Sequence, residues 1–377
     1  MRNMQAAGLP VYNEQSQSQS YLLATFENLI TRVCVVSDAA ERERERERER
    51  DDTKRGWRST PGERNAPRFF RHLPTMAGLA VDLLGLRVFI VCVGLVGNVF
   101  LVLAIVQTKF TRLKSFELFL LGLAAANLEE ILVVIVFDVV VHQSLDAVDD
   151  LSCRSLKFLT KFGEVASILF TVLISIYRQR KLADAEKSAN RPIYLDGVRT
   201  AWAAMGVCAL LAALLSLPVF GIVREGAAGG NVTGNATGCP LDFFQCGGHY
   251  CPVVNGVYKY VFLLLCNMLP LAVVTVTGCL ILHVLLGHRA KVAPMASGGR
   301  KGGGSSLHRS TVAVLAAMGL FQLDWTLYLI LELSGIPTDY PMWAEAEFLI
   351  SFSYTSISPY VYGMGNNLFS LRNFRKK

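Results

Sequence analysis

Three charged side chains follow one another at helical spacing inside an apolar stretch of the chain. Lys157, Lys161 and Glu164 lie at positions i, i+4 and i+7 of a segment rich in leucine, phenylalanine and isoleucine. On a helix this spacing puts two ammonium groups and one carboxylate on one stripe, with Thr160 beside them. Such groups can pair with one another or bind a charged small molecule. Because a buried lysine without an anion loses its proton, we expect Lys161 to pair with Glu164 or with an acid of a neighbouring helix.

A second group of polar and aromatic residues lies in another apolar stretch, residues 311–333. It contains Asp324, Trp325, Tyr328 and Glu332, and Glu332 follows Trp325 by seven residues, about 20° away around a helix. The rings can hold the apolar body of a small molecule, and the acids can serve as counter-ions. Internal ion pairs and solvated helix ends are the structural alternative for all these side chains. The candidate ligand-binding residues are Lys157, Thr160, Lys161, Glu164, Trp325, Tyr328 and Glu332.

Both groups belong to a set of seven long apolar stretches. These stretches cover residues 83–107, 115–141, 154–177, 200–221, 257–286, 311–333 and 343–364. Each reaches the ~20 residues that a helix needs to cross ~30 Å of hydrocarbon. A mean hydropathy of +0.38 with only 18% charged residues is typical of a membrane protein. The sequence therefore predicts an all-α membrane protein with a bundle of seven transmembrane helices, in which ionisable side chains face the interior.

The distribution of basic residues predicts the orientation in the membrane. Three, six, five and four Lys or Arg residues lie in 108–114, 178–199, 287–310 and the tail after residue 364, whereas 142–153, 222–256 and 334–342 together hold one. Basic loops stay in the cytosol, so we expect a plasma-membrane protein with its N-terminus outside and its C-terminus inside. The net charge of +7 then reflects topology and membrane lipids and indicates no nucleic-acid partner.

Three parts of the chain are expected on this basis. Residues 1–82 are predicted to be a disordered extracellular extension of low complexity, because they contain a strict Glu-Arg alternation over 41–50 and little apolar sequence. Residues 83–364 form the seven-helix domain. Residues 365–377 form a basic cytosolic tail with a short amphipathic helix.

The long loop 222–256, predicted to lie outside, carries two acceptor sequences for N-glycosylation, at Asn231 and Asn235. Four of the nine cysteines lie at or in exterior loops, where disulfides are permitted: Cys153, Cys239, Cys246 and Cys251.

Short motifs in the predicted helices resemble, in order, those of the class A G-protein-coupled receptors. They cover residues 83–377 and comprise Gly97-Asn98, Leu123-Ala124-Ala125-Ala126-Asn127, Tyr177-Arg178 with Cys153 25 residues before the arginine, Pro270, Phe321 to Trp325, and Ser358-Pro359-Tyr360-Val361-Tyr362. The resemblance implies that Asn98, Asn127, Glu130, Pro270, Pro359 and Tyr362 form a structural microdomain and that Arg178 couples to a G protein.

Three departures from the usual class A pattern resemble the vomeronasal type-1 receptors and their fish relatives, the olfactory receptor class A-like proteins. No acid precedes Arg178, Leu327 stands where a sixth-helix proline is usual, and Ser358 replaces an asparagine. That group implies chemosensory detection of a small odorant or pheromone and activation of a heterotrimeric G protein of the inhibitory class.

The resemblance also implies a disulfide at Cys153. We expect it to bridge to the 222–256 loop, with Cys251 as the first choice because it lies nearest to the fifth predicted span, and Cys246 next.

Other functions fit the sequence less well. A light-sensing opsin needs a lysine in the seventh span, and 343–364 contains none. A class A receptor for a small amine or a lipid is the alternative, although Thr160 stands where amine receptors have an acid. A transporter is expected to show inverted repeats or broken helices, and the sequence shows neither pattern. No sequence pattern of an enzyme, a cofactor site or a metal site is present.

The charge of the ligand is the last expectation. Two lysines near the predicted pocket mouth favour a small anion that replaces Glu164 as the partner of Lys161. The opposing hypothesis is an amine, with Glu164, Asp324 or Glu332 as its counter-ion.

Overall fold

The computed structural model describes residues 76–107, 114–143, 150–186, 196–222, 243–244, 246, 251–292, 304–333, 343–366 and 368. The chain divides into two compact units, Met1–Cys92 and Val93–Lys377. The predictions for residues 1–75 and for most of the tail lie outside the described residues, as do Asn231, Asn235 and Cys239.

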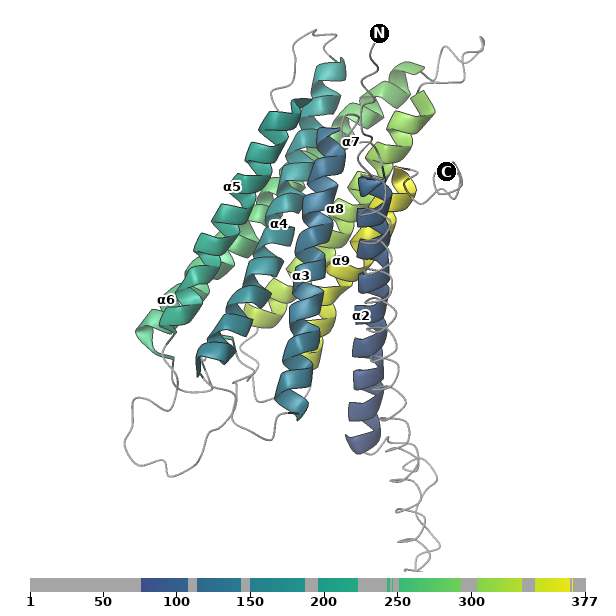
Figure 1. Ribbon diagram of the computed structural model, residues 1–377. Helices are drawn as coiled ribbons and strands as arrows, with labels where there is room; N and C mark the ends of the chain where they lie inside the picture. The colour runs from purple at the N-terminus through teal and green to yellow at the C-terminus, as the bar shows by residue number, and fades with distance from the viewer. Residues whose placement is uncertain are drawn as a thin grey trace, which may run out of the picture. The chain divides into compact units, whose positions relative to one another are not determined.

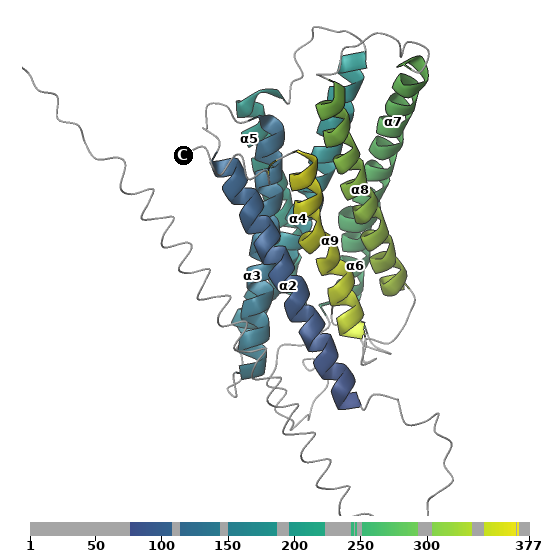
Figure 2. The same ribbon diagram turned by 90° about the vertical axis from the view of Figure 1, so that its right-hand side faces the viewer.

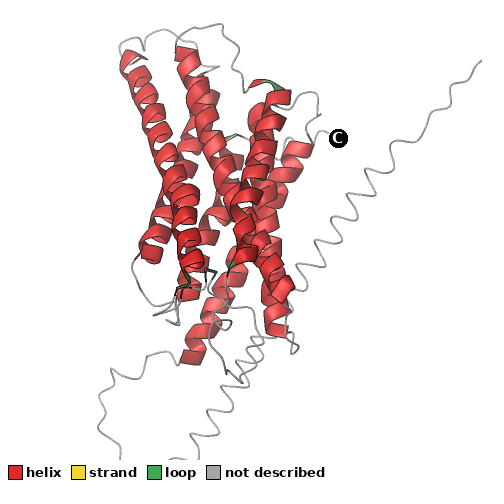
Figure 3. Ribbon diagram, turned by 90° about the vertical axis from the view of Figure 1, so that its left-hand side faces the viewer, coloured by secondary structure: helices red, strands yellow, loops and turns green. Residues whose placement is uncertain are grey.

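Helices account for nearly all of the described residues, and no strand occurs among them (Figure 3). In chain order they are α2 (Met76–Val106), α3 (Ser115–Gln143), α4 (Asp150–Glu186), α5 (Val198–Ser216) with the 3₁₀ turn η4 (Leu217–Gly221), α6 (Val253–Phe262), the π-helix η5 (Leu263–Met268), α7 (Leu269–Val292), α8 (Gly304–Leu333) and α9 (Trp343–Gly365). In Figures 1 and 2, α9 lies beside α8, and the two pack together. α4 packs against α3, α5, α7 and α8.

Every predicted apolar stretch corresponds to a helix, but the helices run further than the stretches. α2 begins at Met76 instead of residue 83, so residues 76–82, which were expected in the N-terminal extension, belong to a helix. α8 begins at Gly304 instead of residue 311. Hydropathy marks only the part of a helix that lies in hydrocarbon, and a helix continues into water wherever its backbone bonds can be kept.

Six helices of the described part are long and apolar enough to cross a membrane. α9, with 23 residues, is the seventh helix, and serine, threonine and tyrosine side chains spread along its length keep it outside this set. Several of them are buried in the bundle, among them Tyr354, Thr355, Ser358 and Tyr362. A helix that turns its polar side chains towards its neighbours can be less apolar than one that faces lipid on most sides.

The outside of the helices is apolar and the inside is partly polar, the reverse of a soluble protein. Large apolar side chains of α5 to α7 are exposed, including Leu210, Leu264 and Val276. Asn127 and Glu130 of α3 are buried. This distribution is expected where lipid surrounds the bundle, because lipid solvates apolar surface and cannot solvate charge.

Two sequence features shape individual helices. Pro270 lies two residues after η5, where the backbone widens to a π-helix. Proline has no N–H and its ring clashes with a carbonyl of the preceding turn, so the local change of pitch accommodates it. Gly97 lets α2 approach α9 closely, because a Cβ there would lie 2.5 Å from a ring carbon of Tyr360. The Tyr360 hydroxyl donates a hydrogen bond to the Val93 carbonyl at 2.8 Å.

Candidate functional site

The predicted ion pair within α4 is present. Lys161 Nζ lies 2.6 Å from Glu164 Oε2, and both side chains are buried, with relative exposures of 6% and 5%. The spacing i,i+3 brings the two groups to one face of the helix, and burial keeps water from competing with the contact. Gly163, next to Glu164, brings α3 against α4, since a Cβ at this position would collide with Glu129 and Glu130.

Three aromatic rings surround the Lys161 ammonium. The centroids of Phe243, Phe262 and Tyr328 lie 4.7, 5.6 and 6.0 Å from Lys161 Nζ. At these distances the negative ring faces attract a cation. We call Glu164 and the three rings the Lys161 cage; its members come from α4, the segment before α6, α6 itself and α8.

A second ion pair, with an aromatic ring beside it, lies next to the cage. Lys259 of α6 contacts Glu332 of α8 at 2.8 Å, and its Nζ lies 5.7 Å from the Phe244 ring centroid. The rings of Phe243 and Phe244 are in T-shaped contact, with centroids 4.8 Å apart. Glu332, predicted to bind ligand, therefore already has a basic partner.

Sequence reasoning missed Lys259 and both phenylalanines. Lys259 is the only lysine or arginine in the fifth apolar stretch, which is a signal that could have identified it. Phe243 and Phe244 lie in a loop and carry no comparable signal.

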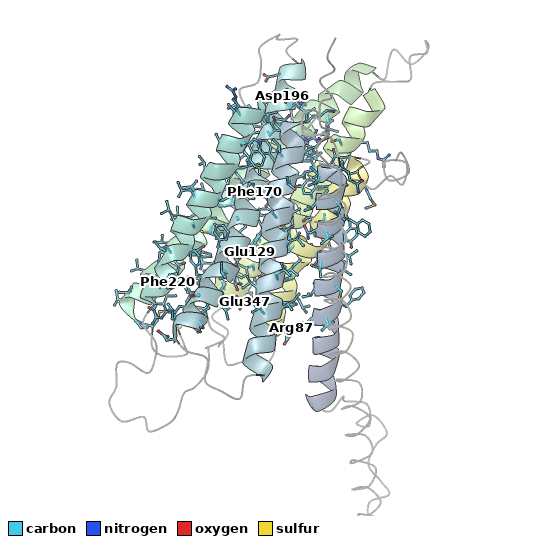
Figure 4. The ribbon with its side chains drawn as sticks, in the orientation of Figure 1. Arg87, Glu129, Phe170, Asp196, Phe220 and Glu347 are labelled. Atoms are coloured by element: carbon cyan, nitrogen blue, oxygen red, sulfur yellow. A yellow bond between two sulfur atoms is a disulfide. The ribbon has the colours of Figure 1, made fainter. Side chains whose placement is uncertain are left out.

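Two other predicted residues, Lys157 and Thr160, lie on the same helix as Lys161, and one acid that was not predicted, Glu347, acts on the cage. Lys157 is buried one turn from Lys161, so it is not a solvated helix end. The Thr160 hydroxyl donates to the Leu156 carbonyl of its own helix at 3.0 Å. Glu347 of α9 interacts electrostatically with Lys161. Figure 4 shows Glu347 in the half of the bundle that contains Phe220, away from Asp196.

A series of rings leads from the cage along α8 to α9. Trp325 lies 5.3 Å from Tyr328 and 6.0 Å from Phe321, and Phe321 lies 5.5 Å from Tyr354 (centroid distances). The Tyr354 hydroxyl is hydrogen-bonded to that of Thr171 in α4 at 2.7 Å. Trp325 therefore reaches the cage through Tyr328.

Three of the predicted microdomain residues lie together in a hydrogen-bonded network. Asn98 donates to the carbonyls of Gly94 and Thr355 at 2.9 and 3.0 Å, and Asn127 donates to Asn98 Oδ1 at 3.0 Å. Ser167 donates to Asn127 Oδ1 at 2.8 Å, and the Thr355 hydroxyl donates to Glu130 Oε2 at 3.1 Å. These bonds connect α2, α3, α4 and α9, so the network holds four helices in register.

At the opposite end of α4, Arg178 is buried and bonded to two other helices. Its Nη2 donates to Ser310 Oγ at 2.6 Å and to Asn366 Oδ1 at 3.2 Å, and its guanidinium carbon lies 3.5 Å above the Phe116 ring. Ser310 also donates to Asn366 Oδ1 at 2.6 Å. We call Arg178, Ser310 and Asn366 the Arg178 clamp. A side chain that joins α4, α8 and the end of α9 does not snorkel to the membrane surface.

Tyr177, where the class A pattern has an acid, bonds to an acid elsewhere. Its hydroxyl donates to Asp196 Oδ1 at 2.7 Å, and Lys181 donates to the same oxygen at 3.1 Å. These donors, the tyrosine first, lower the pKa of Asp196 and keep it ionised. Figure 4 places Asp196 at the end of the bundle opposite to Phe220.

The model of the family described as 7 transmembrane receptor (rhodopsin family) matches residues 97–361, from within α2 to within α9. The match includes the Lys161 cage and most of the helices that carry the clamp. The chain belongs to this family. It is accordingly a G-protein-coupled receptor and a multi-pass membrane protein, in a family of signalling receptors. No curated protein matches the receptor.

The prediction of a disulfide between Cys153 and Cys251 of the receptor is wrong. Cys251 is bonded to Cys246, five residues before it. Closing so short a loop costs little chain entropy, and a prediction based on the reach between span and loop overlooks such a local partner. Cys153 is itself in a disulfide. Its partner lies outside the described residues, since Cys246 and Cys251 are bonded to each other and the remaining described cysteines are thiols.

Arg154 holds the same end of α4 to the turn after α5. It donates to the carbonyls of Phe220 and Ile222 and pairs with Asp150 at 2.7 Å. In the described part of the receptor no group of three or more His, Cys, Asp or Glu side chains could hold a metal ion.

Proposed function

We propose that the receptor is a chemosensory receptor of the vomeronasal type-1-like group, related to the fish olfactory receptor class A-like proteins. A small odorant or pheromone binds at the Lys161 cage, and the Arg178 end activates a heterotrimeric G protein of the inhibitory class. The proposal includes a plasma-membrane orientation with the N-terminus outside, so that the cage is reached from the exterior and the clamp faces the cytosol.

The buried Lys161–Glu164 pair within a shell of rings is the observation that carries this proposal. Removing two charges from water costs several kcal/mol per ion, which the pair only partly recovers, so such a pair adds little to stability. Ionisable groups at this depth in a membrane protein are usually functional. The cage also has the composition of a ligand site, with several aromatic side chains and few polar groups.

A signal from the cage can reach the clamp through packed side chains. The ring series from Tyr328 to Tyr354 continues to Tyr362, which lies beside Tyr354 and interacts electrostatically with Arg178. α8 and α9 carry most of these rings, α8 carries Ser310 of the clamp, and Asn366 follows directly after α9. A shift of α8 against α4 would therefore change both sites, which makes this contact the two-state element of the proposal.

The test is heterologous expression with a reporter G protein and a panel of small acids, amines, bile acids and steroids. Arg178→Ala should abolish the evoked signal while surface expression is retained. Arg180→Ala is the matched control, because Arg180 lies on the same helix with the same charge and is exposed. An evoked signal of wild-type size from Arg178→Ala would refute the coupling role, and a receptor that responds to no small molecule of the panel would argue against chemosensing.

A further inference from the structure

The wall around the Lys161 ammonium is built for a cation. Three ring faces and one carboxylate surround Nζ, and the rings come from separate elements that hold them in place. Aromatic faces carry negative potential, so they attract an ammonium group and repel a carboxylate. An anion that approached Lys161 while Glu164 stays in place would meet these faces and a second negative charge. This geometry disfavours the small anion that the two lysines of α4 predicted.

The second carboxylate oxygen of Glu164 is available as a hydrogen-bond acceptor in the Lys161 cage. Its Oε2 binds Lys161, whereas its Oε1 is buried and makes no hydrogen bond within the described part of the chain. A buried carboxylate oxygen without a donor is costly, and a ligand N–H can satisfy it. This second oxygen distinguishes recognition of an amine from recognition of an apolar molecule.

Lys161 is the movable member of the cage. Its ammonium stands on an unbranched four-carbon stem, while the rings are short side chains packed among one another. Glu347 of α9 acts electrostatically on the same ammonium. Displacement of Lys161 towards α9 would alter the contacts between α4 and α9.

We infer that the Lys161 cage recognises the ammonium group of a small organic amine, and that Lys161 occupies this position in the ligand-free receptor as a built-in competitor. The inference rests on the proposed function, whose ligand site it uses, and names the chemical class of the ligand. A primary, secondary or tertiary amine fits better than a quaternary one, because Glu164 requires an N–H donor.

The test replaces the side chain of Lys161 by a free analogue. Lys161→Ala removes the stem and the ammonium, and n-butylammonium chloride supplies both. We expect n-butylammonium to raise the melting temperature of the purified Lys161→Ala receptor, and sodium butyrate and n-butanol to leave it unchanged. In the wild-type receptor the effect should be smaller, because Lys161 competes.

Glu164→Gln in the Lys161→Ala background is the matched control. It keeps the shape of the acceptor and removes its charge, so the apparent Kd for n-butylammonium should weaken by about tenfold to 100-fold. Where Lys161→Ala does not fold, Lys161→Met keeps the apolar stem, and methylammonium chloride is the probe. Three results would each overturn the inference. They are an equal affinity for n-butylammonium with Glu164 and with Gln at this position, an increase in melting temperature with butyrate, and an unchanged melting temperature with every probe.

Melting temperature needs no G protein, so the two proposals can fail separately. Stabilisation by amines together with an absence of amine-evoked reporter signal would refute the chemosensory role and support the cage as a cation site. Reporter responses to acids alone, with no effect of amines on stability, would overturn the cation site and support chemosensing.

Discussion

Removal of the Ser310 hydroxyl should open the Arg178 clamp and raise basal signalling. In Ser310→Ala, Arg178 loses its 2.6 Å acceptor, and Asn366 loses a 2.6 Å donor. A hydrogen bond to a charged group contributes about 1.5–3 kcal/mol. No carboxylate within the described residues contacts Arg178 in this clamp, so no ionic contact compensates for the loss.

The magnitude follows from the position of the clamp. The clamp joins α4, α8 and the end of α9. Under the proposed function a G-protein helix enters at this end, so the clamp would stabilise the closed form and be broken in the open form. A loss of this size shifts the equilibrium by about tenfold to 100-fold. A receptor with about 1% of molecules open at rest would then have about 10–50% open.

The assay is basal G-protein activity of the unliganded receptor, normalised to surface expression. Ser310→Thr keeps the hydroxyl and is the matched control, expected to stay close to wild type. Asn366→Ala should raise basal activity as well, and the double variant should exceed neither single variant by much, because both act on one network. Basal activity of Ser310→Ala equal to that of wild type, at equal expression, would refute the reasoning.

Three further outcomes follow from contacts elsewhere in the receptor. Gly97→Ala should destabilise the receptor by about 1–3 kcal/mol because the new Cβ meets a tyrosine ring of α9, while Gly206→Ala, with no atom within 4 Å, should have almost no effect on thermal stability. Peptide mapping without reduction should find Cys153 joined to Cys239, the cysteine left in the predicted exterior loop once the pair at its end is formed; a free thiol at Cys153 would contradict this. Hydrogen bonds lower the pKa of Asp196, so its contribution to stability is present above its unfolded pKa of about 3.9 and is lost as the pH falls through the lower folded value. The difference in melting temperature between wild type and Asp196→Asn should therefore stay constant from about pH 5 to 8 and shrink only in stronger acid, and a difference that vanishes near pH 6 would exclude this carboxylate as its origin.

The sequence by itself determined the features that depend on neighbours along the chain. Seven helices follow from the length and hydropathy of seven stretches, and the Lys161–Glu164 pair follows from spacing within one helix, as it depends only on helical geometry. The predicted first residues of α2 and α8 lie too far along the chain, because hydropathy marks the part of a helix in hydrocarbon and not its continuation into water.

The tertiary structure decided which distant side chains complete each site. Phe243 and Phe262 enclose Lys161 from a loop and from α6, and Ser310 and Asn366 reach Arg178 from 132 and 188 residues away. Residue types at such separations carry no mutual signal in one sequence, because their proximity depends on how the helices pack. The three rings around Lys161 are of the same kind, since they come from a loop, α6 and α8, and our inference of a cationic ligand depends on them and not on the lysines of α4 alone.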